Sequence, residues 1–187
     1  MFAIHARYRG RDRRRAELVR NSAKALSQLP NVGEFEVVGV EDIAAALHTA
    51  DGLCDVTMAL LSHGDWAVSI AVAPSVEAAQ ALAKSTLGAH ARAGIVKVGI
   101  RGEKALAADI AGAFLMLGHI LTKRTLEGRE ATSLMRSGYN QNESAHELGI
   151  SKQAMSQRLQ AAGWQAELAG WRLAVRLLEQ AGTLMQK

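Results

Sequence analysis

The chain has 187 residues, of which 49% are hydrophobic and 21% charged, with one cysteine and two prolines. This composition predicts one folded domain or two small ones, and it excludes disordered and disulfide-stapled proteins. The longest uncharged stretch of the most apolar segment, residues 110–122, has 13 residues, fewer than the roughly 20 that span a bilayer. No apolar stretch follows the arginines near Met1, so neither a membrane span nor a secretory signal is expected. The lone Cys54 suits a reducing, cytoplasmic location.

The net charge of +4 is unevenly distributed along the chain. Residues 1–24 carry a net +6, residues 25–83 a net −8 without any lysine or arginine, and residues 84–187 a net +6. A basic C-terminal half is compatible with a polyanionic partner. The first two segments are equally compatible with neutralisation inside one globule, in which the basic residues lie against the acidic ones.

Predicted strands and helices alternate through the first 100 residues. Residues 2–8 alternate apolar with small or basic side chains, which predicts a strand with one apolar and one basic face. The other strands are apolar or β-branched runs, and the helices between them have helix formers and capping residues. We expect helices over 11–29, 51–62 and 75–87, and strands over 35–40, 66–73 and 95–100.

Residues 41–48, EDIAAALH, decide the expected fold. The alanines favour a helix, whereas the position directly after a strand favours the second arm of a hairpin. We favour the hairpin, because it gives the order β-α-β-β-α-β of a ferredoxin-like sandwich, followed by one more helix and strand. The expected fold class is therefore α+β, with a ferredoxin-like domain over 1–101 and an all-α domain over 102–187.

Every segment after residue 102 is predicted to be helical. The helix over 103–123 is apolar around most of its circumference, so it should be buried on several sides and join the two halves. A helix over 126–137 and three more helices follow. The composition changes at Arg101-Gly102, and this change marks the expected domain boundary.

Residues 140–162 have the spacing of a helix-turn-helix. Asn140 and Glu143 form a capping-box pair at the start of one helix, Gly149 ends that helix, and Ser151 caps the next. The short connection forces a sharp angle between the two helices. Five apolar side chains are expected to face a small shared core, namely Ala145, Leu148, Ile150, Met155 and Leu159.

The outward side chains of the second helix predict contacts with DNA. The N-terminal part of a recognition helix is the part that reaches base edges, and arginine is suited to phosphates. The predicted base contacts are Ser151, Lys152, Gln153, Ser156 and Gln157. The predicted phosphate contacts are Arg124, Arg129, Arg136, Gln141 and Arg158.

The stretch ELGISKQAMSQRL resembles the DNA-recognition segments of bacterial helix-turn-helix regulators of the MarR, LysR and sigma-factor types. The resemblance implies sequence-specific DNA binding by a transcriptional regulator. An ordinary helical hairpin with a glycine turn is the alternative interpretation, but the caps, the spacing and the outward polar residues all favour DNA binding.

An apolar seam with 4-3-4-3 spacing follows the helix-turn-helix, in the place where a winged domain would have a β-hairpin. Such a seam is typical of a helix that packs on a partner helix, or on the core of its own protein. Because most DNA readers of this size bind as two-fold dimers with half-sites about 34 to 36 Å apart, we expect a homodimer. The predicted dimer interface is Trp164, Leu168, Trp171, Val175 and Leu178.

The whole chain also resembles bacterial proteins in which a SatD-like domain precedes a helix-turn-helix. The stretches that carry this resemblance are 9–15 (RGRDRRR), 40–43 (VEDI), 64–74 (GDWAVSIAVAP) and 92–94 (RAG). SatD-like domains look like relatives of nucleotide-cyclase and GGDEF folds, in which acids on the first strand and the next hairpin hold two metal ions. Glu41 and Asp42 fit the hairpin position, but the first strand offers His5 and Arg7, so two-metal chemistry is not expected.

No other motif predicts catalysis. The six histidines lack metal-ligand spacing, and the chain has no Walker loop, dinucleotide fingerprint or nucleophile elbow. Cys54 is expected in the core. The sequence therefore predicts a non-enzymatic regulator without metal, cofactor or catalytic residues, which binds double-stranded DNA as a homodimer. Its N-terminal domain would serve dimerisation, an unknown small-molecule effector or a protein partner.

The alternative function is a degenerate cyclase-like protein that binds a nucleotide or another phosphate ligand. In that case the helix-turn-helix is an accessory, and the basic face of His5, Arg7 and Arg9 with residues 11–15 holds the phosphate.

Overall fold

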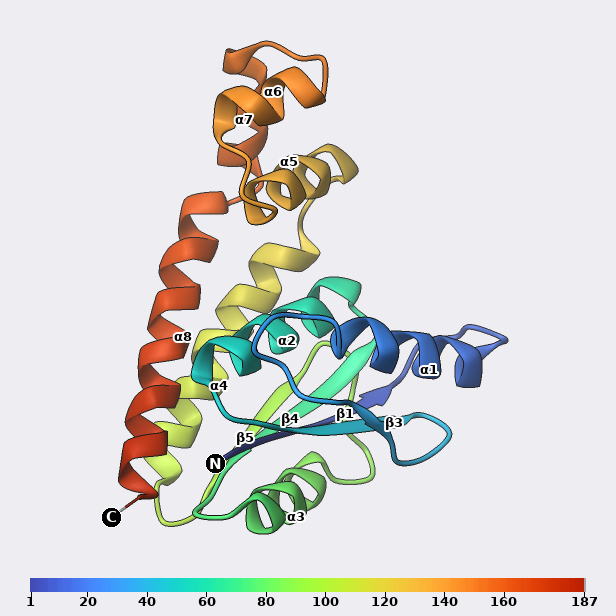
Figure 1. Ribbon diagram of the computed structural model, residues 1–187, viewed down its shortest axis with the longest axis vertical. Helices are drawn as coiled ribbons and strands as arrows, with labels where there is room; N and C mark the ends of the chain where they lie inside the picture. The colour runs from blue at the N-terminus through green and yellow to red at the C-terminus, as the bar shows by residue number, and fades with distance from the viewer. Residues whose placement is uncertain (187) are drawn as a thin grey trace.

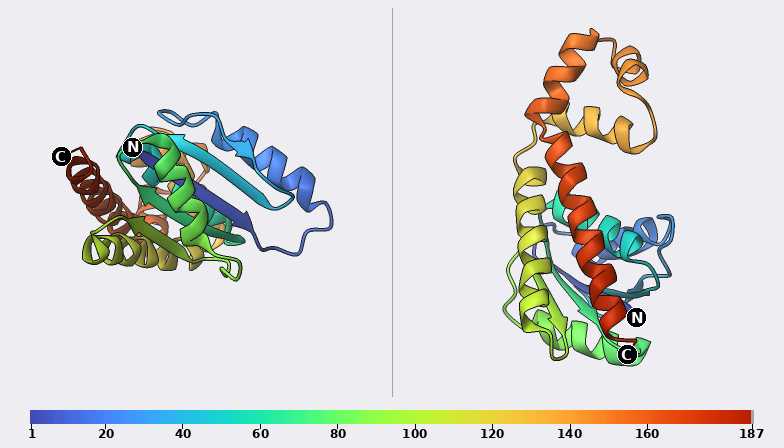
Figure 2. Two further views of the ribbon diagram at one scale, coloured as in Figure 1. Left: turned by 90° about the horizontal axis from the view of Figure 1, so that it is seen from below. Right: turned by 90° about the vertical axis from the view of Figure 1, so that its left-hand side faces the viewer.

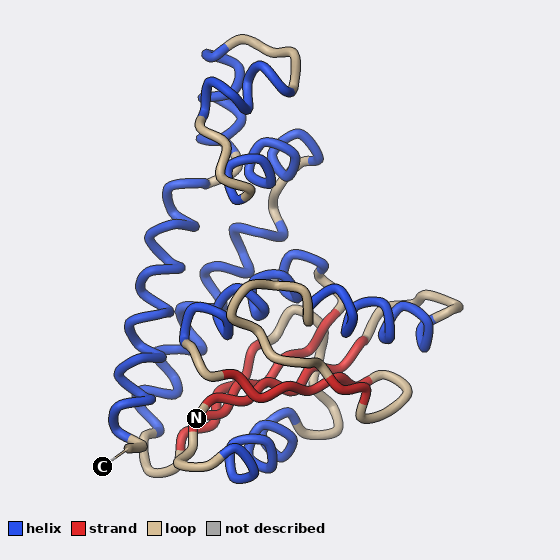
Figure 3. The backbone as a smooth tube through the Cα atoms, in the orientation of Figure 1, coloured by secondary structure: helices blue, strands red, loops and turns tan. Residues whose placement is uncertain are grey.

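The computed structural model describes residues 1–186, which form five strands and eight helices of an α+β chain (Figure 1). The strands are confined to one lobe, and a group of helices stands apart from them (Figure 3). The strands are β1 (Phe2–Tyr8), β2 (Glu36–Val37), β3 (Asp42–Leu47), β4 (Trp66–Val72) and β5 (Val96–Ile100). The helices are α1 (Arg15–Leu26), α2 (Ala50–His63), α3 (Val76–Leu87), α4 (Lys104–Thr122), α5 (Leu126–Arg136), α6 (Gln141–Glu147), α7 (Lys152–Ala161) and α8 (Trp164–Leu184).

The five strands form one mixed sheet in the order β2-β3-β1-β4-β5. Neighbouring strands are antiparallel except for β4 and β5, which are parallel. Residues 42–47 are strand β3, and they pair with Glu36–Val37 on one side and with β1 on the other. The predicted hairpin is thus confirmed, although its first arm is only two residues long.

Both faces of β1 are covered, including the face that the sequence predicts to be basic. Because strand side chains alternate between faces, Ile4 points into the larger core below α2, while Ala3 points toward α3. Ala79 and Ala83 of α3 pack with Ala3, and such small side chains allow a close approach of helix and sheet. Figure 2 (left) shows α3 lying across the sheet.

Helix α4 packs against the sheet, as its all-round apolar sequence predicts. Its side chains Ile110, Phe114 and Leu117 share one core with β1, β4 and α2, and so does Leu178 near the end of α8. Hydrophobic packing therefore crosses the predicted boundary at residue 101. In the described part of the chain, α4 is the one helix whose length and mean hydropathy, 1.6, reach those of a membrane span, which buried core helices also reach.

We use two names from here on. The "sheet lobe" comprises β1–β5, α1–α4 and the second half of α8. The "helical unit" comprises α5, α6, α7 and the first turns of α8. Figure 2 (right) shows α4 and α8 side by side, with α8 continuing into the helical unit.

Candidate nucleic-acid interface

The helical unit has its own small core. The buried members are Ala131 of α5, Ala145 of α6, Met155 and Leu159 of α7, and Trp164 of α8. The partly buried side chains at its edge include Leu148 and Ile150. The five apolar residues predicted to face inward therefore do so, and they pack with Ala131 of α5.

The predicted caps set the geometry of the turn. The Asn140 side chain accepts hydrogen bonds from the backbone N–H of Asn142 and Glu143 at 2.9 and 3.0 Å, and the Glu143 carboxylate accepts from the Asn140 N–H at 2.7 Å. Gly149 has φ +63°, a left-handed conformation that glycine adopts easily. Ser151 Oγ accepts from the N–H of Ala154 at 3.1 Å. These caps fix where α6 ends and where α7 begins.

Helix α7 separates its buried and exposed side chains cleanly. Met155 and Leu159 are buried, and the sequence of α7 contains no acidic residue. A helix turns by about 100° per residue, so side chains three and four positions apart lie next to each other on its surface. The five predicted base contacts are all exposed at the start of α7: Ser151, Lys152, Gln153, Ser156 and Gln157. They form a surface that we call the α7 face.

The predicted phosphate contacts are placed unequally. Arg129 is exposed and has no ion pair among the described residues. Gln141 is half-buried at the start of α6, and Arg158 is half-buried with a guanidinium nitrogen 4.0 Å from the Glu130 carboxylate. Lys123, which was not among the predicted contacts, lines a hollow of about 340 Å³ together with Arg158, Gln157 and the acid Glu127. Lys123 and Arg129 have no ion pair among the described residues, whereas Arg158 lies near two acids.

Arg124 is not available, and its prediction as a phosphate contact is wrong. Its side chain is only 2% exposed and lies between α5 and α8. Its Nε donates to the carbonyl oxygen of Ala162 at 2.8 Å, Nη1 donates to the Thr132 hydroxyl at 3.4 Å, and Nη2 donates to the Glu167 carboxylate. Burial lowers the pKa of Arg124, and the hydrogen bond and charge of Glu167 oppose this effect. Arg124 is thus an internal cation.

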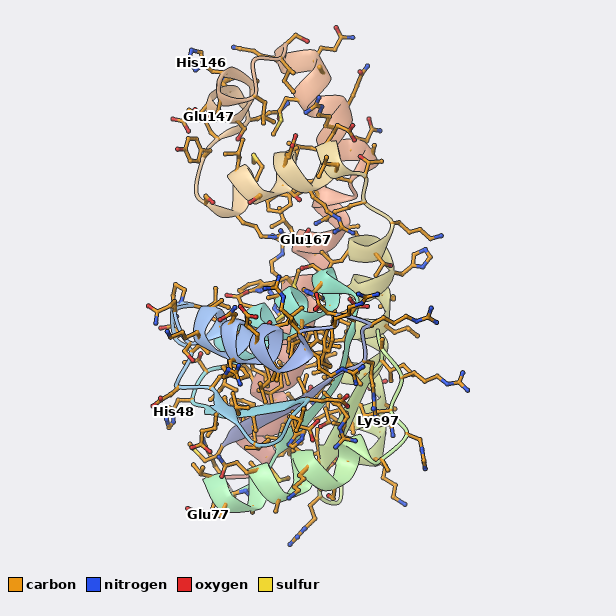
Figure 4. The ribbon with its side chains drawn as sticks, turned by 90° about the vertical axis from the view of Figure 1, so that its right-hand side faces the viewer. His48, Glu77, Lys97, His146, Glu147 and Glu167 are labelled. Carbon is orange, nitrogen blue, oxygen red and sulfur yellow. The ribbon has the colours of Figure 1, made fainter. Side chains whose placement is uncertain are left out.

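Glu167 fastens α5 to α8. Its second carboxylate oxygen accepts a hydrogen bond from Nε of Arg136 at 2.8 Å, and Nη2 of Arg136 lies 2.7 Å from the same oxygen as an ion pair. The Arg136 guanidinium lies 6.0 Å from the centre of the Trp164 ring, within the range of a cation–π contact. Figure 4 shows Glu167 at the junction of the helical unit and the sheet lobe. Arg136 is 42% exposed, so it can reach solvent but is already paired.

The apolar seam of α8 is used inside the chain, and the prediction that it forms a dimer interface is wrong. Trp164 and Leu168 belong to the core of the helical unit, whereas Val175 and Leu178 are buried in the sheet lobe. The indole Nε1 of Trp171 donates to the Asp55 carboxylate of α2 at 2.7 Å. The competing interpretation, packing on the protein's own core, is correct.

The basic face of β1 is occupied as well. Arg7 donates to both carboxylate oxygens of Asp42, and Arg9 donates to the carbonyl oxygens of Ala89 and Ala91. Glu41 pairs with Arg9 and with Arg15. The basic and acidic segments of the chain thus neutralise each other at Arg7, Arg9 and Arg15, whereas Arg11 and Arg13 are exposed without an ion pair among the described residues.

Few other groups resemble a reactive site. No cluster of three histidine, cysteine or acidic side chains suited to a metal ion occurs within residues 1–186. Cys54 is buried, as predicted, and burial raises the pKa of its thiol, with Asp55 and Asp51 adding to the effect. His146 and Glu147 point away from the helical unit at its far end (Figure 4).

Comparison with known proteins adds no relative. The chain matches no protein-family model, no curated protein and no solved structure. The functional interpretation therefore depends on the side chains that the helical unit exposes and on those it buries.

Proposed function

We propose that this protein is a sequence-specific DNA-binding transcriptional regulator that inserts α7 into the major groove. The observation that carries the proposal is the α7 face. It presents one cation, two amides and two hydroxyls without a single acid, while Met155 and Leu159 of the same helix are buried in the core. Lysine, glutamine and serine are residue types that donate to and accept from base edges.

Cations around α7 support contacts with phosphates. Arg129 and Lys123 are exposed, and Arg158 shares the 340 Å³ hollow with Lys123. Phosphate contacts orient a protein on the duplex and make its affinity depend on salt, whereas base contacts give sequence preference. We assign Lys123, Arg129 and Arg158 to phosphates and the α7 face to bases.

We infer a ferredoxin-like core for the sheet lobe. The strand order β2-β3-β1-β4 with antiparallel neighbours supports this inference, and α3 with β5 is the predicted extra helix and strand. The proposed regulator acts in the cytoplasm as a homodimer and has no enzymatic role. The sheet lobe, which resembles SatD-like domains, would bind an effector or a protein partner.

Fluorescence anisotropy tests the proposal. The full chain is titrated with DNA from upstream of its own gene and with a scrambled duplex, over a series of salt concentrations. We expect preference for the upstream DNA and a steep salt dependence. Replacing Gln153 or Gln157 by alanine should cost about 1 to 3 kcal/mol of discrimination at one base pair. Arg158→Ala and Lys123→Ala should instead weaken binding to both duplexes and reduce the salt slope by about 1 each.

Gln180→Ala is the matched control, because Gln180 is an exposed glutamine on α8 in the sheet lobe. It should change neither affinity nor preference. An absence of binding at low salt, or equal binding by all of these variants, would contradict the assignment of α7.

A further inference from the structure

The sheet has two free edges, and their charges differ. The order β2-β3-β1-β4-β5 leaves the outer edges of β2 and β5 without a partner strand within residues 1–186. Strand β2 has only two residues, one of them Glu36, and Glu34 lies just before it. Strand β5 has five residues and contains Lys97, with Arg101 directly after its last residue. The β5 edge is therefore the longer edge and the basic one.

The main chain of β5 directs unused hydrogen-bonding groups outward. The Val68 N–H donates to the carbonyl oxygen of Ile95 at 2.9 Å, and the parallel register pairs Val68 with Val96. In a sheet the main-chain groups of successive residues point alternately to the two sides of the strand, so those of Val96 and Val98 point away from β4. No helix or loop within residues 1–186 makes a hydrogen bond to them. Such an edge is a template for an additional strand.

A groove of about 580 Å³ adjoins this edge. It is lined by β5, by the end of α3 and by the first half of α4, where Ala108 and Ala111 leave room for a second main chain. Its cations are Lys97, Arg101 and Lys104, and no acidic side chain lines it. Figure 4 shows Lys97 on the side of the sheet lobe away from α1. The groove thus combines the free edge of a strand with positive charge.

The three cations are available to a partner. All are exposed, and none has an ion pair among the described residues. Lys97 Nζ donates to the carbonyl oxygen of Leu87 at 2.9 Å, which leaves two of its three donors. A lysine on a sheet edge is a common guard against unwanted pairing. Arg101 and Lys104 lie beyond the strand, however, so they do not guard it, and an acidic partner explains all three cations.

The pleat of β5 specifies the sequence pattern of that partner. Side chains alternate between the two faces of a sheet. Lys97 lies on the α3 face, where it contacts the Leu87 carbonyl, whereas Val96 and Val98 lie on the α4 face and pack against the large core. A strand added to the edge continues both faces. Its side chains should therefore alternate between acidic ones on the α3 face and small apolar ones on the α4 face.

We propose that the β5 edge binds an extended acidic segment of a partner protein, which joins the sheet as an additional strand. Carboxylates of the segment pair with Lys97, Arg101 and Lys104, and its main chain forms hydrogen bonds with Val96 and Val98. In this mode of recognition the main-chain bonds supply affinity and the side chains supply specificity. The site lies in the part of the chain for which the proposed function expects a partner, and it uses none of the residues assigned to DNA.

Fluorescence anisotropy of the full chain with a labelled peptide tests the site. The probe is a peptide longer than β5 in which glutamate and valine alternate, and a lysine–valine peptide is its counterpart. The wild-type chain should bind the acidic peptide and not the basic one. Arg101→Glu combined with Lys104→Glu should raise the dissociation constant of the acidic peptide at least about tenfold. An acid at position 104 favours the first turn of α4, so this loss would not come from unfolding of that helix.

A second pair of arginines provides the matched control. Arg172 and Arg176 of α8 are exposed and lie outside the groove. Changing both to glutamate alters the net charge by the same amount and should leave the dissociation constant unchanged. The variant with glutamate at 101 and 104 should instead bind the lysine–valine peptide more tightly than the wild-type chain does. Equal binding of the basic peptide by both chains would contradict the assigned charge pairs.

Methylation of the peptide nitrogens tests the added strand. Alternate residues of a strand turn their N–H groups to opposite sides. Methylation of one alternate set of the acidic peptide should therefore abolish binding, whereas methylation of the other set should be tolerated. Two methylated peptides that bind equally would overturn strand addition, because attraction between charges alone does not distinguish them.

The remaining outcomes overturn the site itself. If the acidic peptide does not bind at low salt, or if the variant with glutamate at 101 and 104 binds it as the wild type does, the cations only guard the edge. If duplex or single-stranded DNA displaces the peptide, the groove belongs to nucleic acid. Gln153→Ala should leave peptide binding unchanged, and the peptide assay contains no DNA, so its failure and that of the proposed function are distinguishable.

Discussion

The sheet lobe and the helical unit are stabilised by different means. The sheet lobe has one large apolar core, with side chains such as Trp66, Phe114 and Leu61 fully buried. The core of the helical unit has only five buried members, and two of them are alanines. The smaller unit has in addition the buried pair of Arg124 and Glu167, to which the partly exposed Arg136 adds a second cation. A unit too small for a large apolar core is thus held together in part by ions and hydrogen bonds.

The largest effect is expected from Glu167→Ala. This change leaves Arg124 buried without a counter-charge, which costs about 3 to 5 kcal/mol in comparable cases. Hydrogen exchange should accelerate over residues 124–162 while β1 and β4 stay protected. Glu147→Ala, which removes an exposed acid of α6, should change neither region. An equal loss of hydrogen-exchange protection in the helical unit and in the sheet lobe would show that the two unfold together.

The next largest effects are expected from core substitutions, which should show that the helical unit and the sheet lobe unfold separately. Met155→Ala removes a fully buried side chain from the small core and should cost about 2 to 5 kcal/mol. Thermal unfolding should then show two transitions, with the helical unit melting first. Ile110→Ala, in the core of the sheet lobe, should lower the main transition instead. A single transition for the Met155 variant would contradict the independence of the small core.

A smaller effect is expected at the turn between α6 and α7. Gly149 has φ +63°, so alanine there should cost about 1 to 2 kcal/mol. Gly149→Asn should cost less, because asparagine tolerates the left-handed conformation. Chemical denaturation measures the free energy of unfolding of both variants. A larger loss of stability for alanine than for asparagine indicates backbone strain, and equal losses would argue against strain.

Acid should produce the most gradual change, and Asp42 contributes to it in the sheet lobe. Burial opposes ionisation of Asp42, but the hydrogen bonds and charges of Arg7 and His5 outweigh it and lower its pKa. A carboxyl whose folded pKa is depressed stabilises the fold above its ordinary pKa, and this contribution disappears as the pH falls through the folded value. The stability of the sheet lobe should therefore fall below about pH 4, the usual range of aspartate.

Two aspartates allow a controlled measurement of this pH dependence. Asp42→Asn should remove part of the acid-induced loss of stability. Burial raises the pKa of Asp55, against the hydrogen bond from Trp171, so its ionisation opposes folding as the pH rises between its ordinary and its raised value. Asp55→Asn should change the slope of the unfolding free energy against pH in the direction opposite to that of Asp42→Asn. Urea denaturation at a series of pH values measures both slopes.

Local signals predicted the helical unit closely. The Asn140 and Ser151 caps, Gly149 and the inward apolar residues are determined by neighbours within a few positions, and the structure has them where the sequence indicates. The α4 helix and the β3 strand were also identified correctly. In these elements, local preference and tertiary packing agree.

The errors concern partners, which periodicity does not specify. The seam of α8 shows that one face is buried, but the same spacing fits a second copy, the helical unit or the sheet lobe. Arg124 was misjudged because an arginine after an apolar helix normally faces solvent. The signal that was missed is Glu167, an acid within the apolar seam, since buried acids require a partner.

Helix α8 begins at Gly163 in the helical unit and ends beside the first strand, where a Cβ atom added to Gly182 would lie 3.1 Å from the Phe2 ring. With 21 residues it is about 31 Å long. A single continuous helix thus joins the packing around the first strand to the small core of the helical unit, to which it contributes Trp164.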